Sequence, residues 1–388
     1  WRLRRWKRAR LDDPPAPSRR RVQGMSDQLA AVEAMGIAVG AGVPVLLWGA
    51  PGTGKTSAIG AMADAAGWPC ETVIAAIREP SDFSGLPVVV DGVVHFAPPR
   101  WAERLAASGR GLLFLDEIST APPAVQAALL RVVLERVVGD LTLPEEVVVV
   151  AAANPPEQAA DGWDLSAPLA NRFCHLDWRV EAAAFAQGLV GGWPLAIIPD
   201  LPEGWDRGDV YAQAQAQVAA FVTVRPALVC AVPTDAAGAG RGWPSPRTWD
   251  MAARLLTAAE VAGASAQAVT VLVNGALGPG PGTEFLLWRS EMDLPDPEEV
   301  LADPGRFVVP ERADRAYAAL SAVAAAVAAQ PTVERWLAGW QVVVRVGRAT
   351  PDVAAVAART LAQCRPPGAV APPEVKLFAP MLAEAGLL

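Results

Sequence analysis

The chain has 388 residues, 52% hydrophobic and 19% charged, which allows two or three domains with large cores and excludes general disorder. The formal charge of −8 is uneven, because residues 1–24 carry nine Lys and Arg against two Asp and Glu, leaving the remainder at −15. An acidic body argues against a broad nucleic-acid surface. The basic arm 1–24, which contains Pro14-Pro15-Ala16-Pro17, is expected to be disordered and not native, with Met25 as the natural start.

The sequence shows no sign of membrane insertion or of a metal site built from cysteine and histidine. The basic arm lacks the apolar stretch of a signal peptide, and the long uncharged stretches 182–199 and 261–283 are interrupted by turn-forming residues. His95 and His175 are expected in a strand or hairpin. The cysteines are widely spaced, which is typical of buried free thiols in a reducing cytoplasm. They are Cys70, Cys174, Cys230 and Cys364.

From Met25 to about Trp178, strand and helix patterns alternate along the chain. The predicted strands are Val43–Trp48, Glu71–Ala75, Gly111–Leu115, Val147–Ala152 and Phe173–Trp178. The predicted helices between them include Met25–Ala41, Thr56–Ala66 and Pro123–Glu135. Short apolar strands that alternate with helices indicate an α/β fold, a parallel sheet covered on both faces in three αβα layers.

One β-hairpin interrupts this alternation. Residues 87–96 form two valine-rich runs joined by Asp91-Gly92. Asp-Gly tolerates positive φ at both turn positions, which predicts a two-residue hairpin inserted between the second helix and the strand that ends at Asp116.

Beyond Trp178 the sequence is mainly helical. Helical composition covers Gly204–Val224, Trp249–Ala262 and Ala313–Ala329, and a Gly- and Pro-rich connector spans Pro233–Pro246. We expect a nucleotide-binding domain at 25–232, a helical lid at 233–290 and a helical C-terminal extension at 291–388.

A glycine-rich loop, Gly49-Ala50-Pro51-Gly52-Thr53-Gly54-Lys55-Thr56, follows the first predicted strand and opens the next helix. Its glycines let consecutive backbone N–H groups surround a phosphate at the helix N-terminus. Lys55 can supply a charge to the β- and γ-phosphates, and the Thr56 hydroxyl can bind Mg²⁺. The strand–loop–helix setting makes the motif specific, and it predicts that the chain binds a nucleoside triphosphate.

The strand Gly111–Leu115 is followed directly by two carboxylates. Asp116 can hold Mg²⁺ through its water shell, and Glu117 can polarise an attacking water. The alternative is that Asp-Glu only caps the helix that starts near Ala121.

These motifs resemble those of an AAA+ ATPase. Residues 49–56, 112–117, 150–157, 169–173 and 244–247 occur in the order of its Walker A, Walker B, sensor 1, arginine-finger and sensor 2 regions. The hairpin and residues 114–130 are similar to the MoxR-like group. The resemblance covers about 25–290, whereas segment 188–204 has no match within it.

The resemblance implies roles for three further residues. Asn154 would orient the attacking water, Arg172 would reach the nucleotide of a neighbouring subunit, and the lid would swing Arg247 toward the phosphates. Arg172 could also form a structural salt bridge, and Arg131 and Arg136 are rival fingers. These two arginines flank a glutamate where relatives tend to be more acidic.

The implied function is Mg²⁺-dependent ATP hydrolysis by a cytoplasmic hexameric ring that remodels or assembles partner proteins. In this family the partners often contain a von Willebrand factor A domain. Two alternatives remain open, a DNA-directed motor and a nucleotide-binding switch with little hydrolysis. The acidic body disfavours the first, and the intact Asp116-Glu117 pair disfavours the second.

Overall fold

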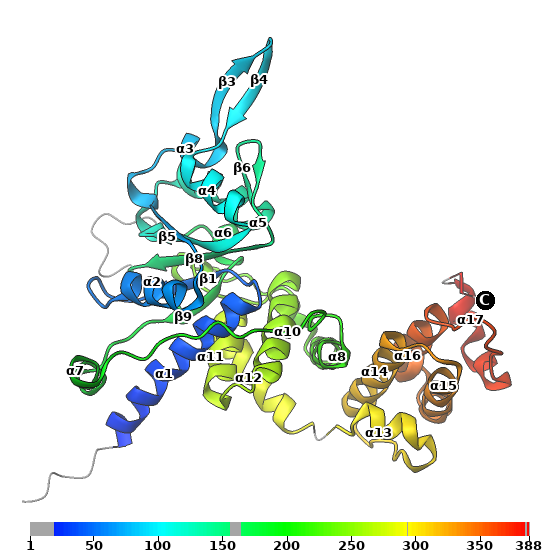
Figure 1. Cartoon of the computed structure of the whole chain (residues 1–388). Helices are drawn as coiled ribbons and strands as arrows, with labels where there is room; N and C mark the ends of the chain where they lie inside the picture. The colour runs from blue at the N-terminus through cyan, green and yellow to red at the C-terminus, as the bar shows by residue number, and fades with distance from the viewer. Residues whose placement is uncertain (1–18, 156–163, 293, 385, 388) are drawn as a thin grey trace, which may run out of the picture.

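The computed structural model describes residues 19–155, 164–292, 294–384 and 386–387. At the centre of the N-terminal part lies a five-stranded parallel sheet with the strand order β2-β5-β8-β1-β9 (Figure 1). Its strands are β1 (Val45–Trp48), β2 (Cys70–Ile74), β5 (Arg110–Asp116), β8 (Glu146–Ala153) and β9 (Cys174–Asp177). Each coincides with one of the five apolar runs in the sequence, so the predicted parallel sheet is confirmed.

The two faces of the sheet build separate cores, because successive residues of a strand point to opposite sides. Leu46 of β1 and Leu113 of β5 pack under α4 (Arg100–Ser108) and α5 (Pro123–Glu135). Their neighbours Leu47 and Phe114 pack on the other face, against α1 (Arg19–Gly40) and α2 (Lys55–Ala66). The three-layer αβα fold is therefore confirmed. Helix α1 begins at Arg19 rather than at Met25, and residues 1–18 of the basic arm lie outside the described residues.

The predicted hairpin is formed by β3 (Leu86–Val90) and β4 (Val93–Ala97), which pair antiparallel. Asp91 and Gly92 have φ values of 53° and 79°, as the two-residue turn requires. The hairpin projects away from the sheet (Figure 1), and its valines are exposed on both faces. The short helix α3 (Ser81–Ser84) precedes it.

A second, shorter hairpin that the sequence did not indicate supports the base of the first. It consists of β6 (Val137–Val138) and β7 (Leu141–Thr142). The Asp140 N–H donates to the Phe96 carbonyl at 2.9 Å, and the Phe96 N–H donates to Asp140 Oδ2 at 2.9 Å. Gly139 and Gly85 allow this close approach, because a Cβ on Gly139 would lie 2.4 Å from the Phe96 carbonyl oxygen.

Helices dominate the rest of the chain, as the sequence predicted. They are α6 (Ala167–Ala170), α7 (Ala182–Gly191), α8 (Asp209–Val224), α9 (Ala236–Ala239), α10 (Pro246–Val261), α11 (Ala266–Leu277) and α12 (Pro279–Ser290). Helix α11 packs on α1, α10, α12 and β9, and α8 packs on α10 and α12. An aromatic cluster holds these helices together, with the Phe221 ring 5.5 Å from that of Trp249 and 5.2 Å from that of Phe285.

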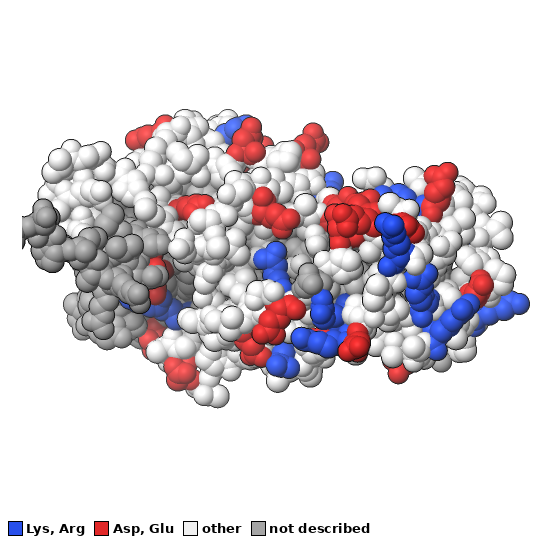
Figure 2. Space-filling view, turned by 90° about the horizontal axis from the view of Figure 1, so that it is seen from below, with Lys and Arg blue, Asp and Glu red and all other residues white. Residues whose placement is uncertain are grey.

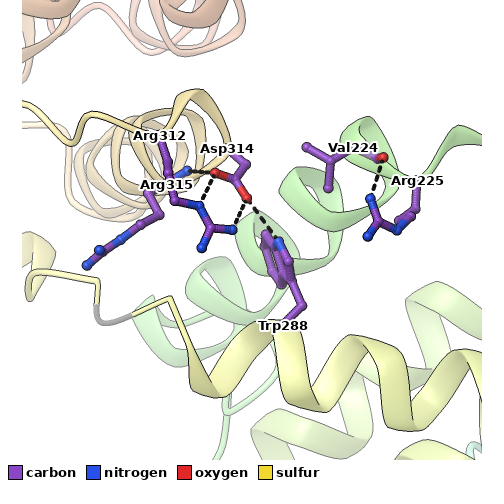
Figure 3. A network of polar contacts seen from close by, with 6 residues as sticks. All are labelled: Val224, Arg225, Trp288, Arg312, Asp314 and Arg315. Carbon is purple, nitrogen blue, oxygen red and sulfur yellow. Dashed lines mark hydrogen bonds and ion pairs between the residues drawn. The ribbon is translucent and has the colours of Figure 1, made fainter.

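The C-terminal helices enclose a third core of their own. They are α13 (Pro297–Ala302), α14 (Ala313–Ala329), α15 (Val333–Gly347), α16 (Pro351–Gln363) and α17 (Ala379–Glu384). Helix α14 packs along α8 and joins this unit to the preceding helices. At the junction, Asp314 accepts hydrogen bonds from Trp288 Nε1 at 3.1 Å and from the Arg312 guanidinium at 2.7 Å (Figure 3).

Among the residues that the structure describes, no helix combines the length and the apolar character needed to cross a bilayer. The four cysteines are free, but the expectation that they are buried holds fully only for Cys174, because Cys70 and Cys364 are half-buried and Cys230 is exposed.

Candidate functional site

The glycine-rich loop Gly49–Thr56 connects β1 to α2 at the carboxyl edge of the sheet, where ligands of parallel sheets bind. Gly52 and Gly54 have φ values of 75° and 81°, which side chains rarely tolerate. The Thr53 hydroxyl donates to the Ala50 carbonyl at 2.7 Å, and Trp178 Nε1 donates to the Thr53 carbonyl at 3.1 Å. The loop is thus held in a phosphate-binding shape by contacts of its own chain.

Lys55 lies in this loop with only 8% of its surface exposed. Its ammonium donates to the Gly49 carbonyl at 2.6 Å, the Ala50 carbonyl at 3.1 Å and Asn154 Oδ1 at 3.0 Å. Burial lowers the pKa of Lys55, while the nearby charges of Asp116 and Glu117 act in the opposite direction. The positive charge is therefore fixed in position rather than left on a mobile side chain.

The side chains expected to bind Mg²⁺ lie next to each other. The Thr56 hydroxyl donates to Asp116 Oδ2 at 3.1 Å, and Asp116 Oδ1 accepts from the Glu117 N–H at 3.0 Å. A hydroxyl beside a carboxylate fits Mg²⁺, which prefers oxygen ligands and keeps several of its waters.

Glu117 and Asn154 complete the constellation at the ends of β5 and β8, which are neighbours in the sheet. Glu117 has a left-handed backbone with φ 56°, which turns the chain sharply at the strand end and leaves the side chain exposed. The Asn154 N–H donates to Ser119 Oγ at 3.3 Å, and this contact fixes the segment beside Lys55. Five of the expected site residues are therefore brought together: Lys55, Thr56, Asp116, Glu117 and Asn154.

Arg172 and Arg247 lie elsewhere, at the opposite end of the strands, where the strands of the sheet begin. Arg172 precedes the start of β9, and it lines a hollow of about 220 Å³ with Arg247 and with Pro44 and Val147 near the starts of β1 and β8. The Arg247 guanidinium donates to Asn171 Oδ1 at 3.4 Å. The structure therefore does not bring Arg247 to the phosphate loop of its own chain.

The position of Arg247 follows from how the start of α10 is bound to the segment before β9. Ser245 caps α10 by accepting a hydrogen bond from the Thr248 N–H, and its hydroxyl donates to Asn171 Oδ1 at 2.7 Å. Asn171 Nδ2 in turn donates to the Trp243 carbonyl at 3.1 Å. Asn171 is buried, so the start of α10 is fixed against the segment before β9.

The 220 Å³ hollow is lined by four arginines and one carboxylate, Asp250, and of the four only Arg254 forms an ion pair within the described residues, with Asp206 at 3.2 Å. Burial and the charge of Arg247 lower the pKa of Arg172, and its buried Nε has no hydrogen-bond partner among the described residues. The Arg172 Nη1 donates to the Pro168 carbonyl. Arg136 and Arg254 also line the hollow. Arg131 instead pairs with Glu135 at 3.2 Å on the surface.

A larger hollow, about 480 Å³, lies between the end of β9, α1, α11 and the start of α12. Gln28 lines it and is 8% exposed, and its Oε1 has no partner among the described residues. Arg241 closes one side, with its guanidinium 4.2 Å from the Trp48 ring centroid and 2.9 Å from Asp177 Oδ1. Sequence reasoning missed this hollow, because its lining comes from segments far apart in the chain.

His175 also lines the 480 Å³ hollow. The Trp48 Nε1 donates to His175 Nδ1 at 2.8 Å, so His175 Nε2 carries the proton that is given to the Ala170 carbonyl at 2.9 Å. Burial lowers the pKa of His175 to about 4, and the ring is neutral at physiological pH. The expectation that His175 lies in a strand is confirmed.

Comparison with known proteins agrees with this geometry. Residues 44–173 match the family described as AAA domain (dynein-related subfamily). The chain has the AAA P-loop fold. An AAA domain implies that the chain binds ATP, and it supports ATP-driven activity. The match does not extend to the MoxR-like group, and a search of curated proteins finds none that matches.

Two solved structures resemble the chain more loosely. One is described as a "putative ATPase" from Cytophaga hutchinsonii, with 18% identity and a TM-score of 0.38, over 68% of this chain and 83% of that one. The other is a full-length MCM homolog from Methanopyrus kandleri, with 18% identity and a TM-score of 0.36, over 68% of this chain and 57% of that one.

Proposed function

We propose that the AAA domain hydrolyses ATP with Mg²⁺. In this scheme the Gly49–Thr56 amides and Lys55 hold the phosphates, and Thr56 and Asp116 hold the cation, which would offset phosphate charge. Glu117 accepts a proton from the attacking water, and Asn154 orients that water. The supporting observation is the convergence of these side chains on one edge of the sheet, with Lys55 3.0 Å from Asn154 and Thr56 3.1 Å from Asp116.

We further propose that each site is completed by a neighbouring copy in a ring, which we expect to be hexameric. Arg172 and Arg247 lie where the strands begin, away from their own phosphate loop, and within the described residues their hydrogen bonds go to the Pro168 carbonyl and Asn171 Oδ1 rather than to a carboxylate. The Arg172 side chain is half-buried and that of Arg247 is exposed, and two neighbouring guanidinium groups that lack a paired carboxylate favour an anion supplied from outside. The γ-phosphate of the adjacent subunit is such an anion, and both arginines would stabilise its developing charge.

The 480 Å³ hollow is proposed to take the nucleobase. It adjoins the phosphate loop, because Asp177 lies opposite Trp48 in the sheet and Gly49 follows Trp48 directly. The unpartnered Gln28 Oε1 would accept a hydrogen bond from the exocyclic amine of adenine. Guanine presents a carbonyl oxygen at that position, so the hollow favours ATP over GTP.

The work performed by hydrolysis is proposed to be MoxR-like remodelling or assembly of partner proteins in the cytoplasm, including proteins with a von Willebrand factor A domain. The projecting β3–β4 hairpin supports this proposal, since seven of its large apolar side chains are exposed and unpartnered. A DNA-directed motor is the alternative, but the chain outside the basic arm carries a charge of −15.

Mixing two inactive variants tests the shared site. Arg172→Ala and Glu117→Gln should each bind ATP and hydrolyse it at least ~100-fold more slowly. A mixture should regain turnover, because some junctions then combine an intact Glu117 with an intact neighbouring Arg172. The matched control is Arg131→Ala, which removes an exposed arginine outside the hollow and should stay active. Full activity of Arg172→Ala at every protein concentration would refute the shared site.

A further inference from the structure

A groove in the C-terminal helices lies outside the nucleotide site. One wall is a single face of α15, because residues 337, 340, 341, 344, 345 and 348 recur at helical spacing. The other wall is the segment Val370–Glu374. The groove encloses about 630 Å³, which is in the size range of sites that take small ligands or short peptide segments.

A buried donor on the α15 wall has no acceptor. Trp336 and Trp340 are each 1% exposed and their rings are 5.9 Å apart. Trp336 Nε1 donates to the Leu361 carbonyl at 2.7 Å, whereas Trp340 Nε1 has no partner among the described residues. A buried N–H without an acceptor is costly, and an oxygen of a bound ligand would satisfy it.

The groove also carries positive charge that the described chain leaves unneutralised. Arg345 donates to two backbone carbonyls, those of Gly305 at 3.1 Å and Phe307 at 2.8 Å, rather than to a carboxylate. Arg348 is exposed and makes no side-chain hydrogen bond or ion pair within the described residues. In the view from below, several Lys and Arg side chains lie at the right-hand end of the molecule, with Asp and Glu side chains beside them (Figure 2).

The remaining lining is apolar or neutral. Leu337, Val344 and the prolines Pro372 and Pro373 supply apolar surface, and Val370 is 78% exposed at the rim. The single rim carboxylate, Glu374, pairs with neither arginine. A nucleic-acid backbone would present one phosphate after another to this carboxylate and to an acidic body, so a discrete acidic ligand is the better match.

We propose that the groove binds an acidic, partly apolar peptide segment of a partner protein. Its carboxylates would lie against Arg345 and Arg348, its apolar side chains against Leu337 and Val370, and a carbonyl oxygen would accept from Trp340 Nε1. Charge complementarity favours an acidic peptide, because the groove is lined by two guanidinium groups and one carboxylate and its other lining residues are uncharged.

The test uses the full chain and a fluorescein-labelled hexapeptide of alternating leucine and glutamate, followed by fluorescence anisotropy. The matched probe replaces every glutamate by glutamine and should bind about tenfold more weakly or worse. Arg348→Ala should weaken binding of the acidic peptide about tenfold, with ATP hydrolysis unchanged, because Arg348 lies on the surface away from the nucleotide site. On binding, the indole N–H resonance of Trp340 should shift downfield while that of Trp336 stays in place.

Variants at the two tryptophans separate binding from folding. Trp340→Phe should weaken peptide binding several-fold, and it should lower the melting temperature only by the cavity that the smaller ring leaves, because Trp340 Nε1 has no hydrogen-bond partner among the described residues. Trp336→Phe leaves a similar cavity and also loses the hydrogen bond to the Leu361 carbonyl, so it should lower the melting temperature further while leaving the affinity of the folded protein unchanged. The proposal is overturned if the acidic peptide fails to bind at millimolar concentration, if both peptides bind equally, or if duplex DNA displaces the acidic peptide at equal charge concentration.

Discussion

Replacing Gly139 by alanine tests the contact between the two hairpins, which sets the direction of the long one. Gly139 has φ +61°, and a Cβ there would lie 2.4 Å from the Phe96 carbonyl oxygen. Because real Cβ contacts are never that short, the hairpins must separate. The separation breaks both hydrogen bonds between Phe96 and Asp140.

The expected magnitude follows from these two effects. A left-handed backbone costs a residue with a side chain about 1–2 kcal/mol, and each lost hydrogen bond about 0.5–1.5 kcal/mol. Together they should lower the free energy of local opening by roughly 3 kcal/mol, which corresponds to amide exchange on the order of a hundredfold faster at Phe96 and Asp140. Gly109→Ala is the control, because Gly109 has φ +78° and nothing within 4 Å of its added Cβ.

Hydrogen exchange followed by mass spectrometry or NMR gives the measurement. In Gly109→Ala the amides of Phe96 and Asp140 should exchange at the wild-type rate, although that variant carries the same backbone penalty. Wild-type exchange of these amides in a folded Gly139→Ala protein would mean that the hairpins do not pack as described.

Four further outcomes are expected. Lys55→Ala should abolish ATP hydrolysis and weaken ATP binding at least ~10-fold in a fluorescent-nucleotide titration, because no other cation occupies the loop. Glu117→Gln should retain bound ATP while single-turnover hydrolysis falls at least ~100-fold, since only water activation is removed. Deleting Val89–Val94 should leave ATP binding intact by the same titration, because the hairpin projects away from the loop. Asp314→Asn should lower the melting temperature at neutral pH. Hydrogen bonding from Arg312 lowers the Asp314 pKa, so the stability it contributes is lost as the pH falls through that pKa, and the difference between variant and wild type should shrink toward pH 3.

The αβα fold was predictable because its signals are local. Each strand is a short apolar run, the phosphate loop has its own glycines, and the Asp91-Gly92 turn needs only two residues. The sequence also predicted that Asp116 and Asn154 lie near Lys55, because the carboxyl ends of neighbouring parallel strands lie at the same end of the sheet.

The remaining features depend on tertiary docking, which leaves no periodic trace in sequence. Arg247 lies beside Arg172 because buried Asn171 binds both the Trp243 carbonyl and Ser245, and no local pattern encodes that contact. The 480 Å³ hollow and the α15 groove likewise draw their linings from segments far apart in the chain. The β6–β7 hairpin was missed because its strands have two residues each.

The separation of Arg172 and Arg247 from their own phosphate loop has an arithmetic consequence. If a neighbour supplies both arginines, a competent catalytic centre belongs to a junction between two copies rather than to a polypeptide. An open row of n copies then has n − 1 competent centres, and only closure gives every copy one. Specific activity should therefore rise stepwise with assembly size. In a closed assembly, a copy that is defective either in its own Glu117 or in its arginines would disable one centre, whereas a copy defective in both would disable two.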